Sequence, residues 1–267
     1  MSNPSRPAVV WAAVLLGVTG CAGTGSAAVS GPSVEPGGTS APPSASAPAS
    51  SALPPTSRPA RPASPTRVAT FTNATLAALL ANVVVDGEKL GALPSDNVRN
   101  TLDNTQETLA ILGAASIAPR ACGRALVASL EVVNVDLPVA VGGRDVMVQL
   151  YDLGDEATAG RVVDAQRPIV TDCARYTSSI KEGGRSVTST TRVTRGSVTA
   201  ASVPNAVSAR SSFSFDGEPV VTMTTSGSVG PIFIQITDSD ARDADRVRLN
   251  SVTLEAVGAA VAKTIDQ

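Results

Sequence analysis

Hydrophobic and polar positions divide the chain into three parts. An apolar run extends from Ala8 to Val18, interrupted only by Gly17, and one basic side chain, Arg6, precedes it. Positions 22 to about 66 are almost entirely Ser, Pro, Ala, Gly and Thr. After Arg67, Val, Leu, Ile, Ala and Thr recur with charges spaced between them. Regular secondary structure is therefore predicted only for this last part.

Helical spacing of apolar residues marks the start of the last part. The segment "TLAALLANVV", which begins at Thr75, is apolar on all sides and has Asn73 or Thr75 as its expected N-cap. Thr101–Gly113 has leucines on one side, and Gly113 is its expected C-terminal stop. The segment "CGRALVASLEVVN", from Cys122, fits either a helix or a strand.

Two more helices are predicted further along the chain. Asp155–Ile180 opens with two acids and continues with helical spacing, and Pro168 inside it should kink or divide the helix. A long helix from about Asp240 closes the chain. Four of its apolar residues share one stripe: Val247, Leu254, Val261 and Ile265.

Strands are predicted by alternation and by β-branched residues. The segment "RDVMVQLYDL" alternates Val146, Val148 and Leu150 with polar neighbours, which is the period of a strand. From Ser186 onward the chain repeats short Val- and Thr-rich runs: "SVTSTTRVTR", "VTAASV", "VSARSSFSF", "EPVVTMTTSGS" and "PIFIQITD". Asp216-Gly217 is typical of a two-residue hairpin turn. The prediction is an α+β fold, a mainly antiparallel β-sheet packed against helices on one face.

The N-terminal apolar run indicates export. It is too short to cross a hydrocarbon core, which needs about 20 residues, and its layout is that of a secretory signal. The run ends in "VTGC", which resembles a bacterial lipobox. This resemblance implies a signal peptide over residues 1–20 and a diacylglycerol on the thiol of Cys21, so that the protein is anchored to the outer face of the cell membrane. An ordinary secretory signal, with Cys21 incidental, is the alternative.

Composition separates a linker from a domain. Residues 21–66 cannot bury enough apolar surface to offset the entropy of ordering, so they are predicted to be a disordered linker. Residues 67–267 are enough for one extracytoplasmic domain with a substantial core. The formal net charge of the chain is −2 and the sequence shows no basic patch, so no nucleic-acid partner is predicted.

Cysteine and histidine counts restrict the chemistry. The chain has three Cys and no His. Lipidation of Cys21 would leave Cys122 and Cys173, which in an exported protein favour a disulfide. Two thiols without histidine make a poor zinc site, and their spacing is not C-x-x-C. We therefore predict one structural disulfide, Cys122–Cys173, and neither a metal ion nor a cofactor.

No catalytic motif is present. The absence of His removes the general base of the common triads, and no S-x-x-K or G-x-S-x-G accompanies the lysines at 89, 181 and 263. Four acids in "TDSDARDADR", Asp238, Asp240, Asp243 and Asp245, could suggest Ca²⁺. They lack the Gly and Glu of an EF-hand loop, and an N-cap with first-turn acids is the preferred interpretation. The glycines in "VGGRD" and "EGGRS" fit turns rather than phosphate loops.

The order of elements from Cys122 to Gln267 resembles a known module. A Cys precedes a strand, the strand leads to the helix that opens "DEATAGRVV", and this helix ends near the second Cys, in "TDCARYTSS". A Thr- and Val-rich meander and a closing helix follow. The layout is similar to the extracellular sensor domains of actinobacterial serine/threonine kinases of the PknH type, and to the lipoproteins of mycobacteria and their relatives that carry the same module.

The resemblance implies a non-enzymatic binding domain. It suggests a cleft that binds an unidentified small ligand. The kinase sensor domains have two disulfides around this cleft, whereas this chain can form only the Cys122–Cys173 bond. We therefore expect a lipoprotein whose sensor-like domain binds a small ligand or an envelope component. The alternative is a carrier of a lipid or other apolar molecule, which would require an apolar cavity of several hundred Å³, on the order of known ligand sites.

Overall fold

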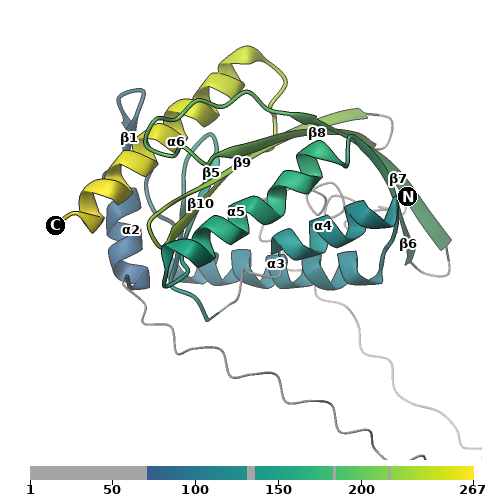
Figure 1. The fold of residues 1–267 in the computed structure, drawn as a ribbon, viewed down its shortest axis with the longest axis horizontal. Coiled ribbons are helices and arrows are strands. Elements are labelled where there is room, and N and C mark those ends of the chain that lie inside the picture. Colours follow the sequence, from purple (N-terminus) through teal and green to yellow (C-terminus); the bar gives the residue numbers. More distant parts are fainter. Residues whose placement is uncertain (1–70, 131–135, 183–184, 216–217) are drawn as a thin grey trace, which may run out of the picture. The chain divides into compact units, whose positions relative to one another are not determined.

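Eight antiparallel strands form the centre of the computed structural model, which describes residues 71–130, 136–182, 185–215 and 218–267 (Figure 1). Their spatial order is β3-β6-β7-β8-β9-β10-β5-β4. The strands are β3 (Ser116–Ala118), β4 (Val139–Gly142), β5 (Met147–Asp152), β6 (Arg175–Glu182), β7 (Arg185–Arg195), β8 (Val207–Phe215), β9 (Glu218–Val229) and β10 (Ile232–Asp238). A separate two-stranded hairpin consists of β1 (Val84–Val85) and β2 (Glu88–Lys89).

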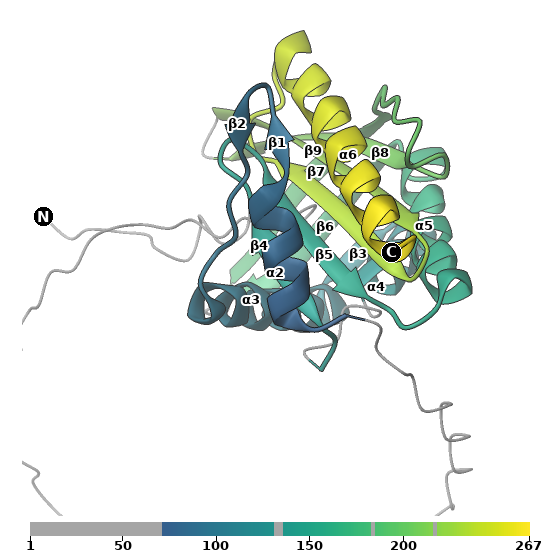
Figure 2. The same ribbon diagram turned by 90° about the vertical axis from the view of Figure 1, so that its left-hand side faces the viewer.

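Five helices in the described part pack against this sheet and complete the predicted α+β fold. They are α2 (Asn73–Asn82), α3 (Ser95–Ala114), α4 (Arg120–Leu130), α5 (Glu156–Thr171) and α6 (Ala244–Ile265). The helices α2 and α6 lie on one face, whereas α3, α4 and α5 lie on the other (Figures 1 and 2). The prediction of helices on one face only is therefore wrong.

Strands β5 and β10 explain why both faces are covered. On β10, Ile232, Ile234 and Ile236 pack with α2 and α6, while Phe233 packs with Tyr151 on the side of α5. Almost every residue of these two strands is buried. Strands with two buried faces appear in sequence as nearly continuous apolar runs, and "PIFIQITD" is such a run.

Helix boundaries differ from the predictions where tertiary contacts decide them. The N-cap of α2 is Thr72, whose hydroxyl accepts from Thr75 N at 3.2 Å, and not Asn73 or Thr75. The helix α3 continues through Gly113 to Ala114, so Gly113 is not its stop. Pro168 does not divide α5, because it lies in the last turn, near the end at Thr171. The prediction of a helix as far as Ile180 is wrong, since residues 175–180 belong to strand β6.

The structure settles one segment whose prediction was ambiguous and corrects one strand that was predicted wrongly. The segment from Cys122 that fitted either element is helical as far as Leu130, and positions 131–135 lie outside the described residues. The predicted strand "VTAASV" is a loop, because β8 already pairs with β7 and β9. Its Val203 is instead buried in the core beside α6. The remaining predicted strands of the meander are present.

The disulfide joins the two sides of the helical layer. Cys122 in α4 and Cys173, just after α5, are bonded, with 5.5 Å between their Cα atoms, as the sequence predicts. Both are almost fully buried, in a cluster with Tyr176 and Val193 of the sheet. Closing a loop of this size stabilises a fold by about 4 kcal/mol in the chain-entropy model.

The Asp216-Gly217 turn lies outside the described residues, but β8 and β9 pair as predicted, with Phe215 opposite Glu218.

Tyr151 and Tyr176 are the only tyrosines of the chain, and both are 1% exposed. Burial raises the pKa of Tyr151 and raises that of Tyr176 to about 12. In the unfolded chain both titrate near pH 10. The folded state thus keeps protons that the unfolded state loses, and stability is lost as the pH rises above about 10. We expect little tyrosinate absorbance from the folded protein at pH 11, and its appearance together with the loss of circular dichroism. Gradual ionisation of the folded protein near pH 10 would contradict this burial.

Candidate functional site

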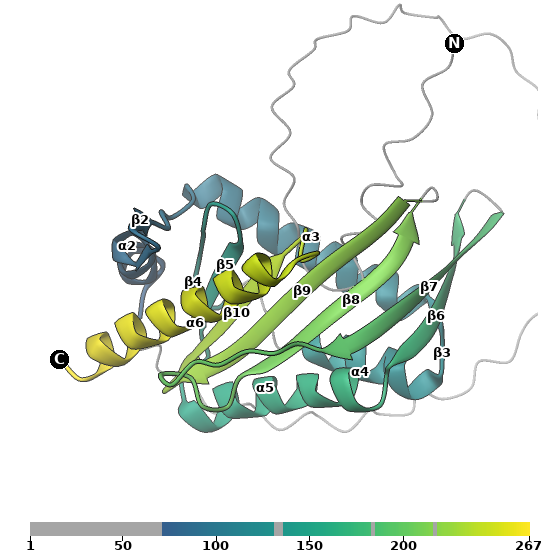
Figure 3. The same cartoon turned by 90° about the horizontal axis from the view of Figure 1, so that it is seen from above.

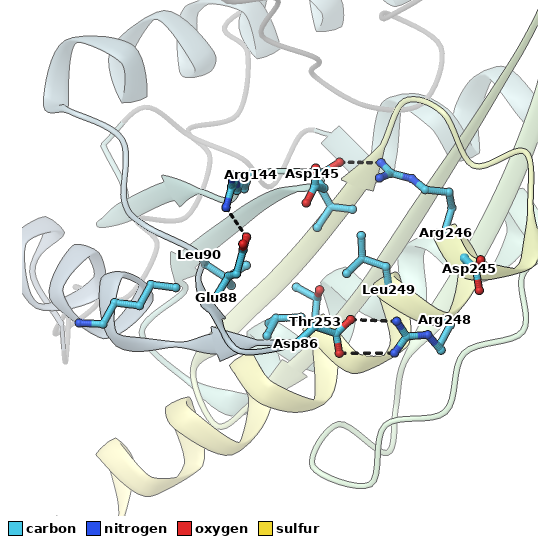
Figure 4. A pocket seen from close by; sticks show the side chains of 13 residues that line it. Asp86, Glu88, Leu90, Arg144, Asp145, Asp245, Arg246, Arg248, Leu249 and Thr253 are labelled. Carbon is cyan, nitrogen blue, oxygen red and sulfur yellow. Dashed lines mark hydrogen bonds and ion pairs between the residues drawn. The ribbon is translucent and has the colours of Figure 1, made fainter.

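A small hairpin stands at the edge of the fold and forms one wall of a pocket (Figure 4). Strands β1 and β2 are joined by Asp86 and Gly87, both with positive φ angles, 49° and 84°. Two residues with positive φ are what a type I′ hairpin turn requires, and Asp-Gly is a preferred pair for it. The chain after the hairpin continues along the sheet edge, where Leu93 N donates to Val141 O at 2.7 Å. The hairpin is thereby attached to β4.

The hairpin pocket has a volume of about 250 Å³ and an apolar floor with a charged rim. Four apolar residues line the floor: Val85, Leu90, Val146 and Leu249. Eight charged residues line the rim, four of each sign: Asp86, Glu88, Asp145 and Asp245, and Lys89, Arg144, Arg246 and Arg248. They come from the hairpin, the β4–β5 connection and the start of α6. The pocket is therefore electrically balanced and small.

Two ion pairs connect the hairpin to the other walls. Arg248 of α6 donates to both carboxylate oxygens of Asp86, with its Nη2 2.9 Å from Oδ2, and this hydrogen bond raises the pKa of Arg248. Arg144 of the β4–β5 connection pairs with Glu88. All four side chains are at least half exposed, so solvent screens both pairs and each adds little to stability. These two ion pairs, unlike the core packing of Val85 and Leu90, are contacts that a ligand or a charge change can displace.

Thr253 is the polar group at the floor of the pocket. It belongs to α6, lines the pocket, and is fully buried. Its hydroxyl has no hydrogen-bond partner in the part of the chain that the structure describes. An unpaired buried hydroxyl costs free energy, and native structures usually pair such a group with protein, water or a ligand. Thr253 thus offers an unused hydrogen bond where a ligand would lie.

Asp238 and Arg246 form a charge pair behind one wall of the pocket. Arg246 donates from Nη2 to Oδ1 of Asp238 at 2.7 Å and from Nε to Oδ2 at 2.9 Å. It also donates to the carbonyl oxygen of Asp145 at 2.6 Å. Asp238 is fully buried, and its hydrogen bond raises the pKa of Arg246. One guanidinium thus joins the end of β10, the start of α6 and the β4–β5 connection.

The four acids considered for Ca²⁺ have separate roles. Asp243 is the N-cap of α6 and accepts from Arg246 N at 3.0 Å, and Asp245 lies in the first turn, as the capping interpretation predicts. Asp240 pairs with Arg242 on the surface, and Asp238 is buried against Arg246. Among the described residues, no group of three or more His, Cys, Asp or Glu is placed to hold a metal ion.

The other residues named from the sequence are dispersed. Lys89 lies at the rim of the hairpin pocket, Lys181 on β6, and Lys263 in the last turn of α6. The glycines of "VGGRD" end β4 and begin its connection to β5, where Gly143 has a φ of 110°. Cys21 lies outside the described residues, as do the glycines of "EGGRS". None of the five described helices has both the length and the apolar character of a membrane span.

A second hollow lies between α3 and α4 on the other side of the sheet. This α3–α4 groove has a volume of about 690 Å³ and is more open than the hairpin pocket. Most of its lining is apolar or small, including Leu112, Ile117 and Val127. Arg120 and Arg124 are its charged residues, and both side chains are exposed.

The sequence prediction missed the hairpin pocket. A usable signal was present in "VVVDGEKL", where an Asp-Gly pair separates two short runs, as in a hairpin. The sequence carries no comparable local signal for the segments that form the other walls of the pocket. Arg144 and Arg248 lie 56 and 162 positions from their partners, so only the tertiary fold brings them together.

Replacing Asp238 with Asn should destabilise the fold by about 2 kcal/mol, because the buried carboxylate would lose its charge-assisted hydrogen bonds from the partly exposed Arg246. The matched control is Asp240→Asn, which breaks an exposed pair and should cost less than about 1 kcal/mol. Urea unfolding measures both free energies. Equal losses of unfolding free energy in the two variants would show that the Asp238–Arg246 pair stabilises the fold no more than an exposed ion pair.

Comparisons with known proteins give a likeness of fold only. No protein-family model matches the chain, and no curated protein matches it in sequence. Among solved structures, the chain is similar to the extracellular domain of PknH from Mycobacterium tuberculosis. The two share 11% sequence identity and a TM-score of 0.41, over 75% of this chain and 98% of that one.

Proposed function

We propose that residues 67–267 form a non-enzymatic binding domain of the cell envelope, which takes a small ligand bearing both charges into the hairpin pocket. The observation that carries this proposal is the combination of an apolar floor, an unpaired buried Thr253 hydroxyl and a rim with four charges of each sign. A free amino acid or a dipeptide has the matching chemistry: an ammonium group, a carboxylate and an apolar side chain. The volume of about 250 Å³ is below that of typical sites for drug-sized ligands, which favours a ligand of this size.

Each part of the pocket has a defined role in this proposal. Arg248 and Arg144 are positioned to receive a carboxylate once a ligand competes with their exposed hairpin partners. Asp145 and Asp245 supply carboxylates for an ammonium group. Leu249 and Leu90 would cover the apolar side chain. Charges of both signs at the rim favour a zwitterion over a singly charged molecule, because each ligand charge then meets an opposite one.

Removal of the Thr253 hydroxyl tests the site. The exported protein is purified with Cys21→Ala, and free amino acids and dipeptides are screened for a rise in melting temperature, which reports binding to the folded state. For the best ligand, Thr253→Val should weaken affinity about 3- to 10-fold, the value of one hydrogen bond. Stability without ligand should stay equal or rise, since an unpaired buried hydroxyl is removed.

Thr237→Val is the matched control. Thr237 is also buried with an unpaired hydroxyl, but it lies outside the pocket lining. Its replacement should change stability in the same direction and leave affinity unchanged. If no member of the panel binds, or if both variants lose affinity equally, the hairpin pocket is not the ligand site.

A carrier of a lipid or other apolar molecule is the second candidate function. The α3–α4 groove favours it, because its volume is of the size required and its lining is mostly apolar. The same preparation distinguishes the two functions by native mass spectrometry. An acyl-lipid adduct that Val127→Glu removes and Thr253→Val retains would support the carrier. Such an adduct would place the main function in the groove rather than in the hairpin pocket.

Anchoring through Cys21 belongs to the proposal and has its own test. The lipobox-like "VTGC" supports a diacylglycerol on Cys21, which would attach the domain to the outer face of the membrane. Cys21→Ala should move the protein from the membrane fraction to the soluble extracytoplasmic fraction and abolish incorporation of labelled palmitate. Retention of the variant in the membrane would show that another part of the chain provides the anchor.

A further inference from the structure

One part of the sheet has a face without a helix from the described part of the chain. Strands β6, β7 and β8 are covered by α4 and α5 on one side, while α6 lies over β9 and β10 on the other (Figure 3). The exposed and partly exposed side chains of β6–β8 that point away from α4 and α5 form what we call the open face. Its members are Arg175, Thr177, Ser179, Lys181, Ser186, Thr188, Thr190, Arg192, Thr194, Arg210, Ser212 and Ser214.

Burial confirms the two faces of these strands. The intervening residues Tyr176, Ser178, Thr191, Val193 and Phe213 are buried, whereas the members of the open face are exposed or partly exposed. Alternation of this kind is expected for strands covered on one side only.

The charged members of the open face are all positive. Arg175 is directly opposite Arg192 in the β6–β7 pairing. Arg210 is opposite Thr194 on the next strand, and so lies diagonally from Arg192. Directly opposed residues have Cβ atoms about 5 Å apart, and like charges there repel. No acidic residue is among the members of the open face.

The three arginines differ in the hydrogen bonds that their side chains make with other described residues. Arg210 donates from Nε to the carbonyl of Ala241 at 3.0 Å and from Nη2 to the carbonyl of Arg242 at 3.1 Å, which holds the loop before α6. The side chains of Arg175 and Arg192 are exposed and make no hydrogen bond or ion pair with other described residues. Two adjacent guanidinium groups without a carboxylate weaken the fold, and a bound anion would remove that cost.

Hydroxyl groups surround the arginines. Ser179 Oγ lies 2.8 Å from Ser186 Oγ and 3.0 Å from Thr188 Oγ1, and Thr177 Oγ1 lies 3.4 Å from Thr190 Oγ1. These groups bond to one another and retain capacity for further hydrogen bonds. The open face therefore presents guanidinium groups together with hydroxyl groups that can donate hydrogen bonds.

We propose that the open face binds a linear phosphate-bearing polymer through contacts with its backbone phosphates. Guanidinium groups match phosphate oxygens in a bidentate arrangement, and a row of cations on successive strands suits an anion that repeats along a chain. The face has no aromatic residue on which nucleobases could stack, which argues against a nucleic acid. It also holds none of the exposed large apolar side chains of the described part, which argues against insertion into a membrane.

Binding of inorganic polyphosphate tests this proposal. The probe is fluorescein-labelled polyphosphate, titrated with the exported protein carrying Cys21→Ala and followed by fluorescence anisotropy at low and raised salt. The double variant Arg175→Gln/Arg192→Gln should bind at least about tenfold more weakly at low salt. The slope of log K against log salt should fall by roughly 0.7 for each phosphate that the variant no longer neutralises. The control Arg99→Gln/Lys263→Gln removes the same charge away from the open face and should change affinity less than about twofold.

Stability provides an independent readout. Because the opposed arginines repel each other, the double variant should melt at the same or a higher temperature than the parent at low salt. If it does not fold, Arg175→Lys/Arg192→Lys keeps the charge, loses the planar fork and should show an intermediate loss of affinity. Several results would overturn the proposal: absence of binding by the parent, an equal loss in variant and control, or tighter binding of either a DNA oligonucleotide of equal charge or vesicles of anionic phospholipid.

Discussion

The bidentate contact between Asp238 and Arg246 is the constraint on which the described fold and its pocket depend. Asp238 ends β10 and is fully buried, so its carboxylate needs a charged partner. Arg246 provides it from the first turns of α6 and also reaches the carbonyl of Asp145. Asn250, one turn later, donates to Asp238 Oδ2 at 3.3 Å. The direction in which α6 leaves the sheet follows from these bonds, and so does the position of Thr253 and Arg248 beside the hairpin.

Local sequence patterns predicted most of the helices and strands, but they did not predict that helices cover both faces of the sheet. The strands from Ser186 onward follow β-branched runs, and α5 follows its own apolar spacing. The presence of helices on both faces depends instead on which strands lie beneath α2 and α6. The run "PIFIQITD" already carried this information, since Phe233 and the isoleucines beside it face opposite sides. "VTAASV" has strand composition, but composition cannot show that no strand edge is available to it.

The disulfide and the hairpin pocket differ in how far sequence could predict them. Cys122 and Cys173 were identified by counting, because only one pair remains once Cys21 is assigned to the anchor. The pocket needs three segments whose contacts are long-range, and the exposed ion pairs at its rim follow no local rule. Thr253 is harder still. In sequence it is one threonine of a helix, and only its burial without a partner among the described residues distinguishes it.

Net charge of the chain conceals two opposite local arrangements. The total is −2, yet the hairpin pocket balances four acids with four bases, and the open face carries basic residues with no acid. In the pocket, acids and bases lie side by side and two pairs of them already form ion pairs, so ligand binding there exchanges ion pairs and releases few counterions. On the open face, a polyanion would displace counterions at each phosphate it brings to an arginine, which makes its affinity strongly salt-dependent. The arrangement of charge on the fold, rather than its sum, therefore determines what each surface can bind.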